Sequence, residues 1–128
     1  MDTLVYLQRG TELFRDLIGA SYNDFTCYEL AREIYKRLGI ELPEFVNLTG
    51  VSLIRQLVIE KQKRTIELSK PEPFCIVHIA RGEAETHVGV VLGDCKQFIH
   101  SCSRTGVIIS KLKNYKDFIR GYYKWKQE

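Results

Sequence analysis

Apolar and polar positions follow a helical period in the first half of the chain and a strand-like period in the second. Three stretches with helical spacing come first, at residues 3–18, 26–38 and 51–64. Short runs rich in Val, Ile, Phe and Tyr follow, separated by turn residues, at 74–80, 86–93, 96–101, 106–110 and 119–125. Helices followed by closely spaced strands predict an α+β domain, with N-terminal helices packed on a mainly antiparallel sheet of four or five strands.

The second helical stretch carries a cysteine at its start. Thr26 and Glu29 form an S/T-x-x-E capping box, which predicts a helix beginning at Thr26 with Cys27 in its first turn. Gly39 is the expected end of this helix. Unpaired N–H groups and the positive end of the helix dipole favour a thiolate at such a position. The alternative is a buried cysteine that falls near a helix start by coincidence.

Composition limits the possible classes of protein. A length of 128 residues fits a single domain spanning 1–128, and 45% hydrophobic and 27% charged residues are ordinary for a globular protein. A formal charge of +3 is too small to indicate a nucleic-acid partner. The N-terminus does not resemble a signal peptide, and no apolar run approaches a membrane span, so we expect synthesis in the cytoplasm and no membrane partner.

Two histidines in the strand half are candidates to act with Cys27. His87 opens the second strand-like run and His100 lies in the third. If these runs form a hairpin across Gly93-Asp94, strand pleating allows both histidines to face the cysteine helix. A cysteine peptidase requires a thiolate nucleophile, an imidazole that exchanges a proton with it, and a polar group that orients the imidazole. Each histidine is otherwise an ordinary core or surface residue.

Four motifs, in the same order as in a known family, carry a resemblance. They are Gly19-Ala20-Ser21-Tyr22 before the cysteine, Gly39-Ile40-Glu41-Leu42-Pro43 after its helix, His87-Val88-Gly89, and Phe98-Ile99-His100. The chain resembles the NlpC-like family of papain-fold cysteine peptidases, most closely the short branch found in phage tail proteins. Its final strand-like run, containing Gly-Tyr-Tyr-Lys at 121–124, is similar to the family's ending.

The resemblance implies a papain-like fold and a role for each motif residue. Cys27 would be the nucleophile, His87 the general base and acid, and His100 the residue that orients His87. The backbone N–H of Cys27 would contribute to an oxyanion hole, and Tyr22 would line the substrate site. No cofactor is implied. The expected partners are a peptide or muropeptide substrate and, for the phage-tail branch, other tail proteins of a virion.

The residues around the cysteine depart from the family pattern. The family usually has Asp directly before the cysteine and Ser-Gly directly after it, where this chain has Thr26 and then Tyr28. In peptidoglycan-cleaving members these residues grip the charged ends of the stem peptide. Asp24 is a candidate replacement, so Asp24 and Tyr28 join Tyr22 as candidate substrate-binding residues.

Three functions remain open at this point. The leading hypothesis is a cysteine hydrolase that cleaves an amide bond in a peptidoglycan stem peptide or a related small peptide. The second is a phage tail structural or assembly protein that keeps the fold with little or no activity. The third is other acyl chemistry at the same cysteine, such as acyl transfer, deamidation or removal of a protein tag.

A zinc site is the remaining chemical alternative in the strand half. Its candidate ligands are Cys75, His78, Cys95, His100 and Cys102. Cys75 and His78 are an odd number of positions apart, so pleating sends them to opposite faces, and no C-x2-C pair is present. We therefore expect no metal site and interpret Cys75, Cys95 and Cys102 as reduced core or turn thiols.

Overall fold

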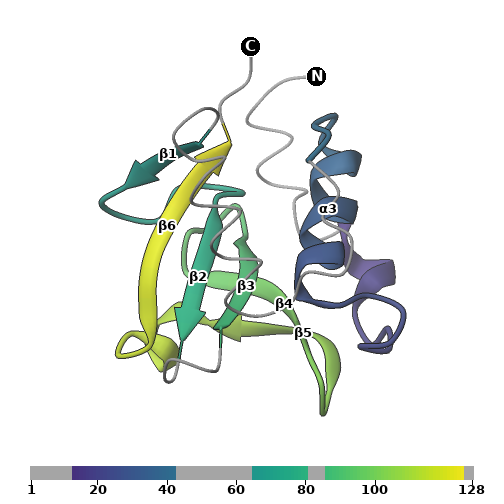
Figure 1. Cartoon of the computed structure of the whole chain (residues 1–128). Helices are drawn as coiled ribbons and strands as arrows, with labels where there is room; N and C mark the ends of the chain where they lie inside the picture. The colour runs from purple at the N-terminus through teal and green to yellow at the C-terminus, as the bar shows by residue number, and fades with distance from the viewer. Residues whose placement is uncertain (1–12, 43–64, 81–85, 126–128) are drawn as a thin grey trace.

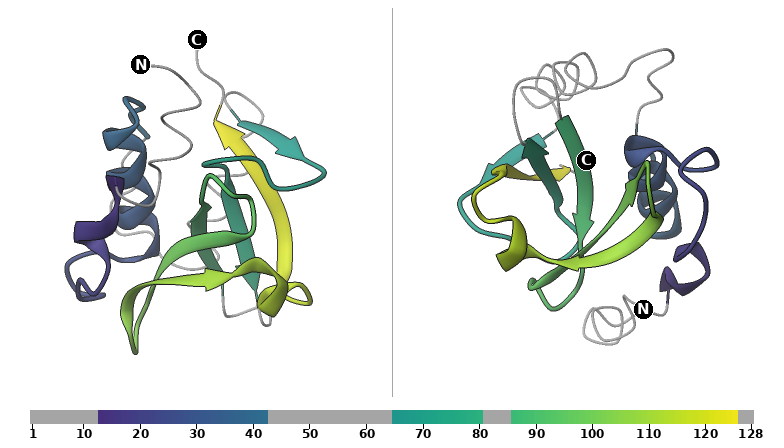
Figure 2. Two further views of the ribbon diagram at one scale, coloured as in Figure 1. Left: turned by 180° about the vertical axis from the view of Figure 1, so that it is seen from behind. Right: turned by 90° about the horizontal axis from the view of Figure 1, so that it is seen from below.

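The computed structural model describes residues 13–42, 65–80 and 86–125, which form one α-helix packed on a six-stranded antiparallel sheet (Figure 1). The strand order is β1-β6-β2-β3-β4-β5. The sheet is curled, so that β4 and β5 cross beneath β2 and β3 while helix α3 lies alongside (Figures 1 and 2). The predicted α+β class and antiparallel sheet are confirmed. No helix among the described residues is long and apolar enough to cross a membrane.

The predicted strands are confirmed, and one strand was missed. The five that were expected are β2 (Ile76–Ala80), β3 (Thr86–Val91), β4 (Gln97–Cys102), β5 (Gly106–Lys111) and β6 (Ile119–Trp125). Strand β1 (Thr65–Leu68) pairs with β6 at the edge of the sheet. Its four residues follow directly on the lysine-rich end of a helical pattern, so they are too short to show a period of their own.

Helix α3 (Cys27–Arg37) begins and ends where the sequence predicts. Thr26 is its N-cap residue, although its side chain makes no capping hydrogen bond, so the reciprocal bonds of the predicted capping box are not formed. At the other end Gly39 has φ +83°, and its N–H donates to the Lys36 carbonyl while that of Ile40 donates to the Tyr35 carbonyl. This pair of bonds is a Schellman motif, which glycine accommodates without steric cost.

The other two predicted helices fall mostly outside the described residues. Residues 51–64 lie wholly outside them, as do residues 3–12 of the first. The described end of that first stretch contains the short 3-10 helix η1 (Arg15–Leu17) instead of a continuing α-helix. Arg37 of α3 holds η1 in place, because its guanidinium forms an ion pair with Asp16 and also donates to the Leu13 carbonyl.

Alternate residues of the sheet pack into two cores, one on each face. The α3 core joins buried residues of α3 to one face of β3 and β4, including Val88, Val90 and Ile99. The second core lies on the opposite face and includes Val77, Val91, Phe98 and Leu112 of β2, β3, β4 and the 3-10 helix η2 (Leu112–Tyr115). Because both faces are covered, residues 98–101 of β4 are buried without interruption, and they include the polar His100 and Ser101.

The loop that leads into α3 is bonded to β4 and β5. The Gly19 N–H donates to the Val107 carbonyl, and the Val107 N–H donates to the Ala20 carbonyl. The N···O distance is 2.9 Å in both bonds. Closer to the helix, the buried Ser101 hydroxyl donates to the carbonyl of Phe25, two residues before Cys27. These bonds fix the start of α3 relative to the strands.

Gly106 is expected to be essential for this attachment. It has φ +74°, and a Cβ at this position would lie 2.2 Å from the Ala20 carbonyl oxygen. Gly106→Ala should therefore lower the free energy of unfolding by about 3 kcal/mol, combining backbone strain with overpacking. Gly39→Ala is the matched control, because Gly39 also has positive φ but open space around it, and it should cost only about 1 kcal/mol. Urea denaturation of both variants measures the difference, and equal losses would contradict the assigned contact.

Candidate active site

Cys27 is the first residue of α3, so its sulfur is carried at the N-terminal end of a helix that packs on β3 and β4. The side chain is partly buried against the α3 core. Among the groups acting on the thiol are the backbone N–H of Val88 and those of Tyr28 and of Cys27 itself. Val88 directly follows His87, so the thiol and the start of β3 are neighbours.

Burial dominates the electrostatics of this thiol. It raises the pKa of Cys27 above the ordinary value, while the N–H groups of Val88, Tyr28 and Cys27 lower it and the nearby Cys102 raises it further. The helix start thus favours the thiolate as the sequence predicts, but the loss of solvent outweighs it. With the pKa raised, an additional group must accept the proton before Cys27 can act as a nucleophile near neutral pH.

His87 and His100 form a direct hydrogen bond, with His87 Nε2 and His100 Nδ1 2.7 Å apart. They come from adjacent antiparallel strands in which Gly89 pairs with His100, as the hairpin across Gly93-Asp94 predicts. Pleating places both rings on the face of the second core, because Val88 and Val90 take the α3 face. The expectation that both histidines face α3 is therefore wrong. The backbone N–H of Val88, next to His87, is the part of β3 that acts on the Cys27 thiol.

His100 is held rigidly. It is 1% exposed, its ring stacks on Phe98 with centroids 4.3 Å apart, and the edge of Tyr115 contacts it from another side. Its Nε2 lies 2.8 Å from the Ser110 hydroxyl on β5. Burial, followed by the nearby His87, lowers the pKa of His100 to about 3. His100 is therefore neutral over the whole physiological range.

A neutral His100 gives the hydrogen-bond chain a defined direction when His87 is charged. Neutral imidazole has one N–H and one acceptor nitrogen, whereas imidazolium has two N–H groups. If His87 gains a proton, its Nε2–H must donate to His100 Nδ1, and His100 Nε2–H must then donate to Ser110 Oγ. This chain stabilises a positive charge on His87 and orients its ring, leaving Nδ1 as the nitrogen that exchanges protons with a neighbouring group.

The three candidate substrate-binding residues lie in different surroundings. Tyr22 is half buried and close enough to Cys27 and Cys102 that their charges, after burial itself, raise the pKa of its phenol. Tyr28 is 5% exposed within the α3 core, so it offers little surface to a substrate. Asp24 is exposed and lines a groove with Glu29 and Arg32 along α3. Of the three side chains, that of Tyr22 is the one whose pKa shows the influence of the Cys27 thiol.

The histidines have two further polar neighbours, of which sequence reasoning placed Cys102 on the face of His100 and missed Ser110. Cys102 Sγ lies 3.4 Å from His100 Nδ1, and Ser110 Oγ contacts the other nitrogen of the same ring. His87, His100 and Cys102 each have one nitrogen or sulfur atom that could bind a metal, and these three atoms lie within 4.8 Å of one another. The spacing of His100 and Cys102 already indicated a shared face. Ser110 needed the β4–β5 register, which pairs it with Phe98.

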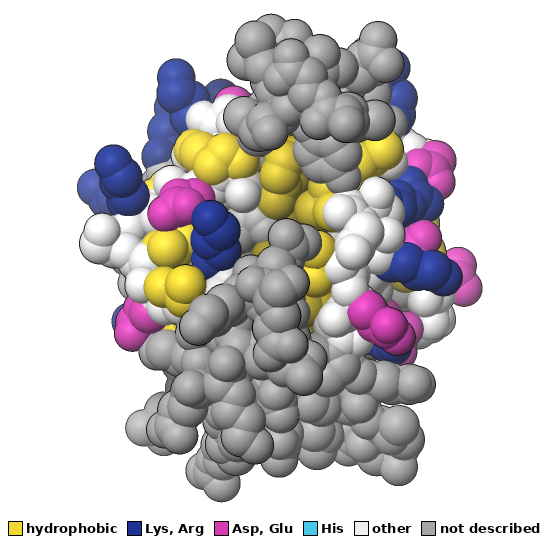
Figure 3. Space-filling view, turned by 90° about the horizontal axis from the view of Figure 1, so that it is seen from above, with side chains coloured by type: hydrophobic (Ala, Val, Ile, Leu, Met, Phe, Trp, Pro, Cys, Tyr) yellow, Lys and Arg dark blue, Asp and Glu magenta, His cyan; other side chains and the backbone are white. Residues whose placement is uncertain are grey.

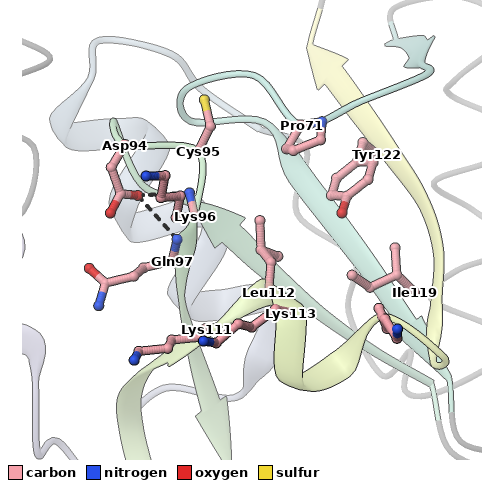
Figure 4. A pocket seen from close by; sticks show the side chains of 11 residues that line it. Pro71, Asp94, Cys95, Lys96, Gln97, Lys111, Leu112, Lys113, Ile119 and Tyr122 are labelled. Carbon is pink, nitrogen blue, oxygen red and sulfur yellow. Dashed lines mark hydrogen bonds between the residues drawn. The ribbon is translucent and has the colours of Figure 1, made fainter.

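A second feature lies at the opposite end of β3, beyond the turn that follows it (Figure 4). This pocket has a volume of about 620 Å³ and combines lysines with apolar side chains such as Leu112, Ile119 and Tyr122. Asp94 shapes the turn by accepting hydrogen bonds from the backbone of Lys96 and Gln97. None of the candidate catalytic or substrate-binding residues lines this pocket.

Charges on the described surface show no dominant sign in the view from above. Basic and acidic side chains are interspersed around hydrophobic ones on that face (Figure 3). This distribution agrees with the small net charge of the whole chain, +3. An extended basic surface of the kind that binds nucleic acid is not seen among the described residues of this face.

Comparison with known protein families identifies a family that the chain matches. The model of the NlpC/P60 family matches residues 16–122, which include α3 and all of β1 to β5. Members of this family are generally cysteine peptidases and related hydrolases. No curated protein matches the chain.

Proposed function

The chain belongs to the NlpC/P60 family, and from that premise we propose that it is a cysteine hydrolase that cleaves an amide bond in a peptidoglycan stem peptide or a related small peptide. The observation that carries the proposal is the hydrogen-bond chain from His87 through His100 to Ser110. This chain begins at His87, next to Val88, whose backbone N–H acts on the Cys27 thiol. The proposed triad is Cys27, His87 and His100.

The reaction uses each group in turn. His87 accepts the proton of Cys27, and the resulting imidazolium is stabilised through His100. The thiolate attacks the carbonyl carbon of the amide, and backbone N–H groups at the start of α3 stabilise the oxyanion. His87 then protonates the departing amine, which leaves a thioester. Water, deprotonated by His87, hydrolyses the thioester and regenerates the thiol.

The substrate class is the most specific part of this proposal. The family's Asp and Ser next to the cysteine are replaced by Thr26 and the buried Tyr28, so the usual groups that hold the stem peptide's charged ends are absent from these positions. Tyr22, beside the thiol, is the best-placed residue to contact substrate. The proposed substrate is a small peptide or a muropeptide, cleaved either by a phage tail component or by a cytoplasmic enzyme that acts on recycled wall fragments.

A second candidate is a tail assembly protein with this fold and little activity. The raised pKa of Cys27 favours it, because a thiol that keeps its proton is a poor nucleophile. Other acyl chemistry at Cys27, such as transfer, deamidation or tag removal, would use the same triad and is separated from hydrolysis of wall peptides only by substrate screening.

Alkylation of Cys27 by iodoacetamide distinguishes the hydrolase from the assembly protein. In a variant that retains Cys27 as its single cysteine, we expect labelling at pH 6 to be at least about tenfold faster than when His87→Ala is added, because burial otherwise keeps the thiol protonated. Mass spectrometry follows the labelling rate against pH. A pH profile that is the same with and without His87 would reject the proposed ion pair and favour the assembly role.

A further inference from the structure

The cluster formed by His87, His100 and Cys102 has the composition of a metal site as well as that of a proton relay. We propose that it binds Zn²⁺ through His87 Nε2, His100 Nδ1 and Cys102 Sγ, with water in the fourth position, and that bound zinc switches the hydrolase off. The inhibitory part rests on the proposed function, whereas zinc binding itself does not.

The distances suit a tetrahedral ion. Zn–N bonds of about 2.0 Å and a Zn–S bond of about 2.3 Å place neighbouring ligand atoms roughly 3.3 to 3.6 Å apart. His100 Nδ1 and Cys102 Sγ are already 3.4 Å apart. His87 Nε2 and His100 Nδ1 are 2.7 Å apart, so the two rings must separate by about 0.6 Å when the ion replaces the shared proton. The remaining pair, His87 Nε2 and Cys102 Sγ, lies within 4.8 Å and must close to about 3.5 Å around the ion.

The surroundings of His100 are those of an oriented metal ligand. A zinc-bound histidine usually has its second ring nitrogen held by a hydrogen bond, which fixes the tautomer and the ring. Here Ser110 Oγ lies 2.8 Å from His100 Nε2. The stacked Phe98 and the edge of Tyr115 restrict the same ring. His100 can therefore present Nδ1 to an ion with little reorganisation.

Inhibition follows from the use of His87. The ring nitrogen that binds zinc is the one that bonds to His100 in the metal-free protein. When His87 binds zinc, the positive charge of the ion lies next to its ring. This charge disfavours the transfer of a proton from Cys27 to His87. Cys27 itself is outside the proposed ligand set, so zinc would block the base and leave the nucleophile unligated.

Co²⁺ provides a spectroscopic test that does not depend on activity. Titration of the reduced, full-length protein with Co²⁺ should give a sulfur-to-cobalt charge-transfer band and tetrahedral visible bands, which added Zn²⁺ should bleach. The charge-transfer band should be lost in Cys102→Ser and kept in Cys27→Ala and in the matched control Cys95→Ser. Ser110→Ala should keep the band but weaken zinc affinity by about tenfold or more.

Each different result would reject one specific part of the proposal. A wild-type protein without the thiolate band, or a band that survives Cys102→Ser, would reject the site, and loss of the band in Cys27→Ala would reject the ligand set. Hydrolysis is measured separately as the ratio of rates without and with zinc, which should fall toward one in Cys102→Ser. If the metal-free wild-type protein does not hydrolyse the substrate, the proposed function is rejected, and the cobalt spectrum still decides whether the metal site exists. If zinc binds without slowing hydrolysis, the proposed inhibition by zinc is rejected.

Discussion

Replacing Cys27 with alanine should reduce amide hydrolysis by at least about 10³-fold, because the proposed reaction proceeds through an acyl intermediate on the Cys27 sulfur. Cys27 carries the thiol at the start of α3, where the backbone N–H of Val88 acts on it. The partly buried position allows alanine without a large cavity, so the fold should be retained. The measurement is release of free amine from a muropeptide or a small peptide panel, with circular dichroism to confirm folding.

The control for this experiment is a second partly exposed cysteine. Cys95 lies in the turn after β3, at the other end of the strand from His87, and Cys95→Ser should hydrolyse the same substrate at close to the wild-type rate. Activity that survives in Cys27→Ala would contradict the nucleophile assignment. Loss of activity in both variants would instead point to a general effect of removing a thiol.

How much of this molecule the sequence predicts depends on whether a feature is local. Strands β2 to β6 and the limits of α3 were predictable, since each is defined by its own apolar pattern, by Gly39 at a helix end, or by turn residues. The four residues of β1 were not, because their strand character comes from pairing with β6 at the sheet edge. Local pattern cannot supply that information.

The same distinction applies to the candidate site. Cys27, His87 and His100 could be selected from sequence, and the β3–β4 hairpin that joins the two histidines was predictable from its turn. The face on which the histidines lie was not, because it depends on which side of the sheet α3 covers, and Val88 and Val90 are the β3 residues packed against α3. Ser110 and Tyr115 come from later elements and join His100 only through tertiary packing.

Burial of a neutral His100 should also make the fold sensitive to acid. Its folded pKa is about 3 because of burial and the neighbouring His87, while an unfolded histidine titrates near its ordinary value of 6.5. Between these values the unfolded state binds more protons than the folded state, so stability rises with pH across this window. The contribution is fully present above about pH 6.5 and declines as the pH falls toward 3, by up to about 1.4 kcal/mol per pH unit.

His100→Gln isolates this term, because glutamine retains a polar side chain that does not titrate. The free energy of unfolding, measured by urea denaturation from pH 4 to pH 7 with a chelator present, should change less steeply with pH in the variant than in the wild type. Loss of packing against Phe98 will lower the variant's stability at every pH, so the slope is the informative quantity. The carboxylate of Asp16 also loses stabilisation in acid, through its ion pair with Arg37, but it contributes equally to both proteins. Equal slopes would mean that His100 accepts a proton in the folded state. It could then no longer serve as the neutral acceptor that holds a charged His87.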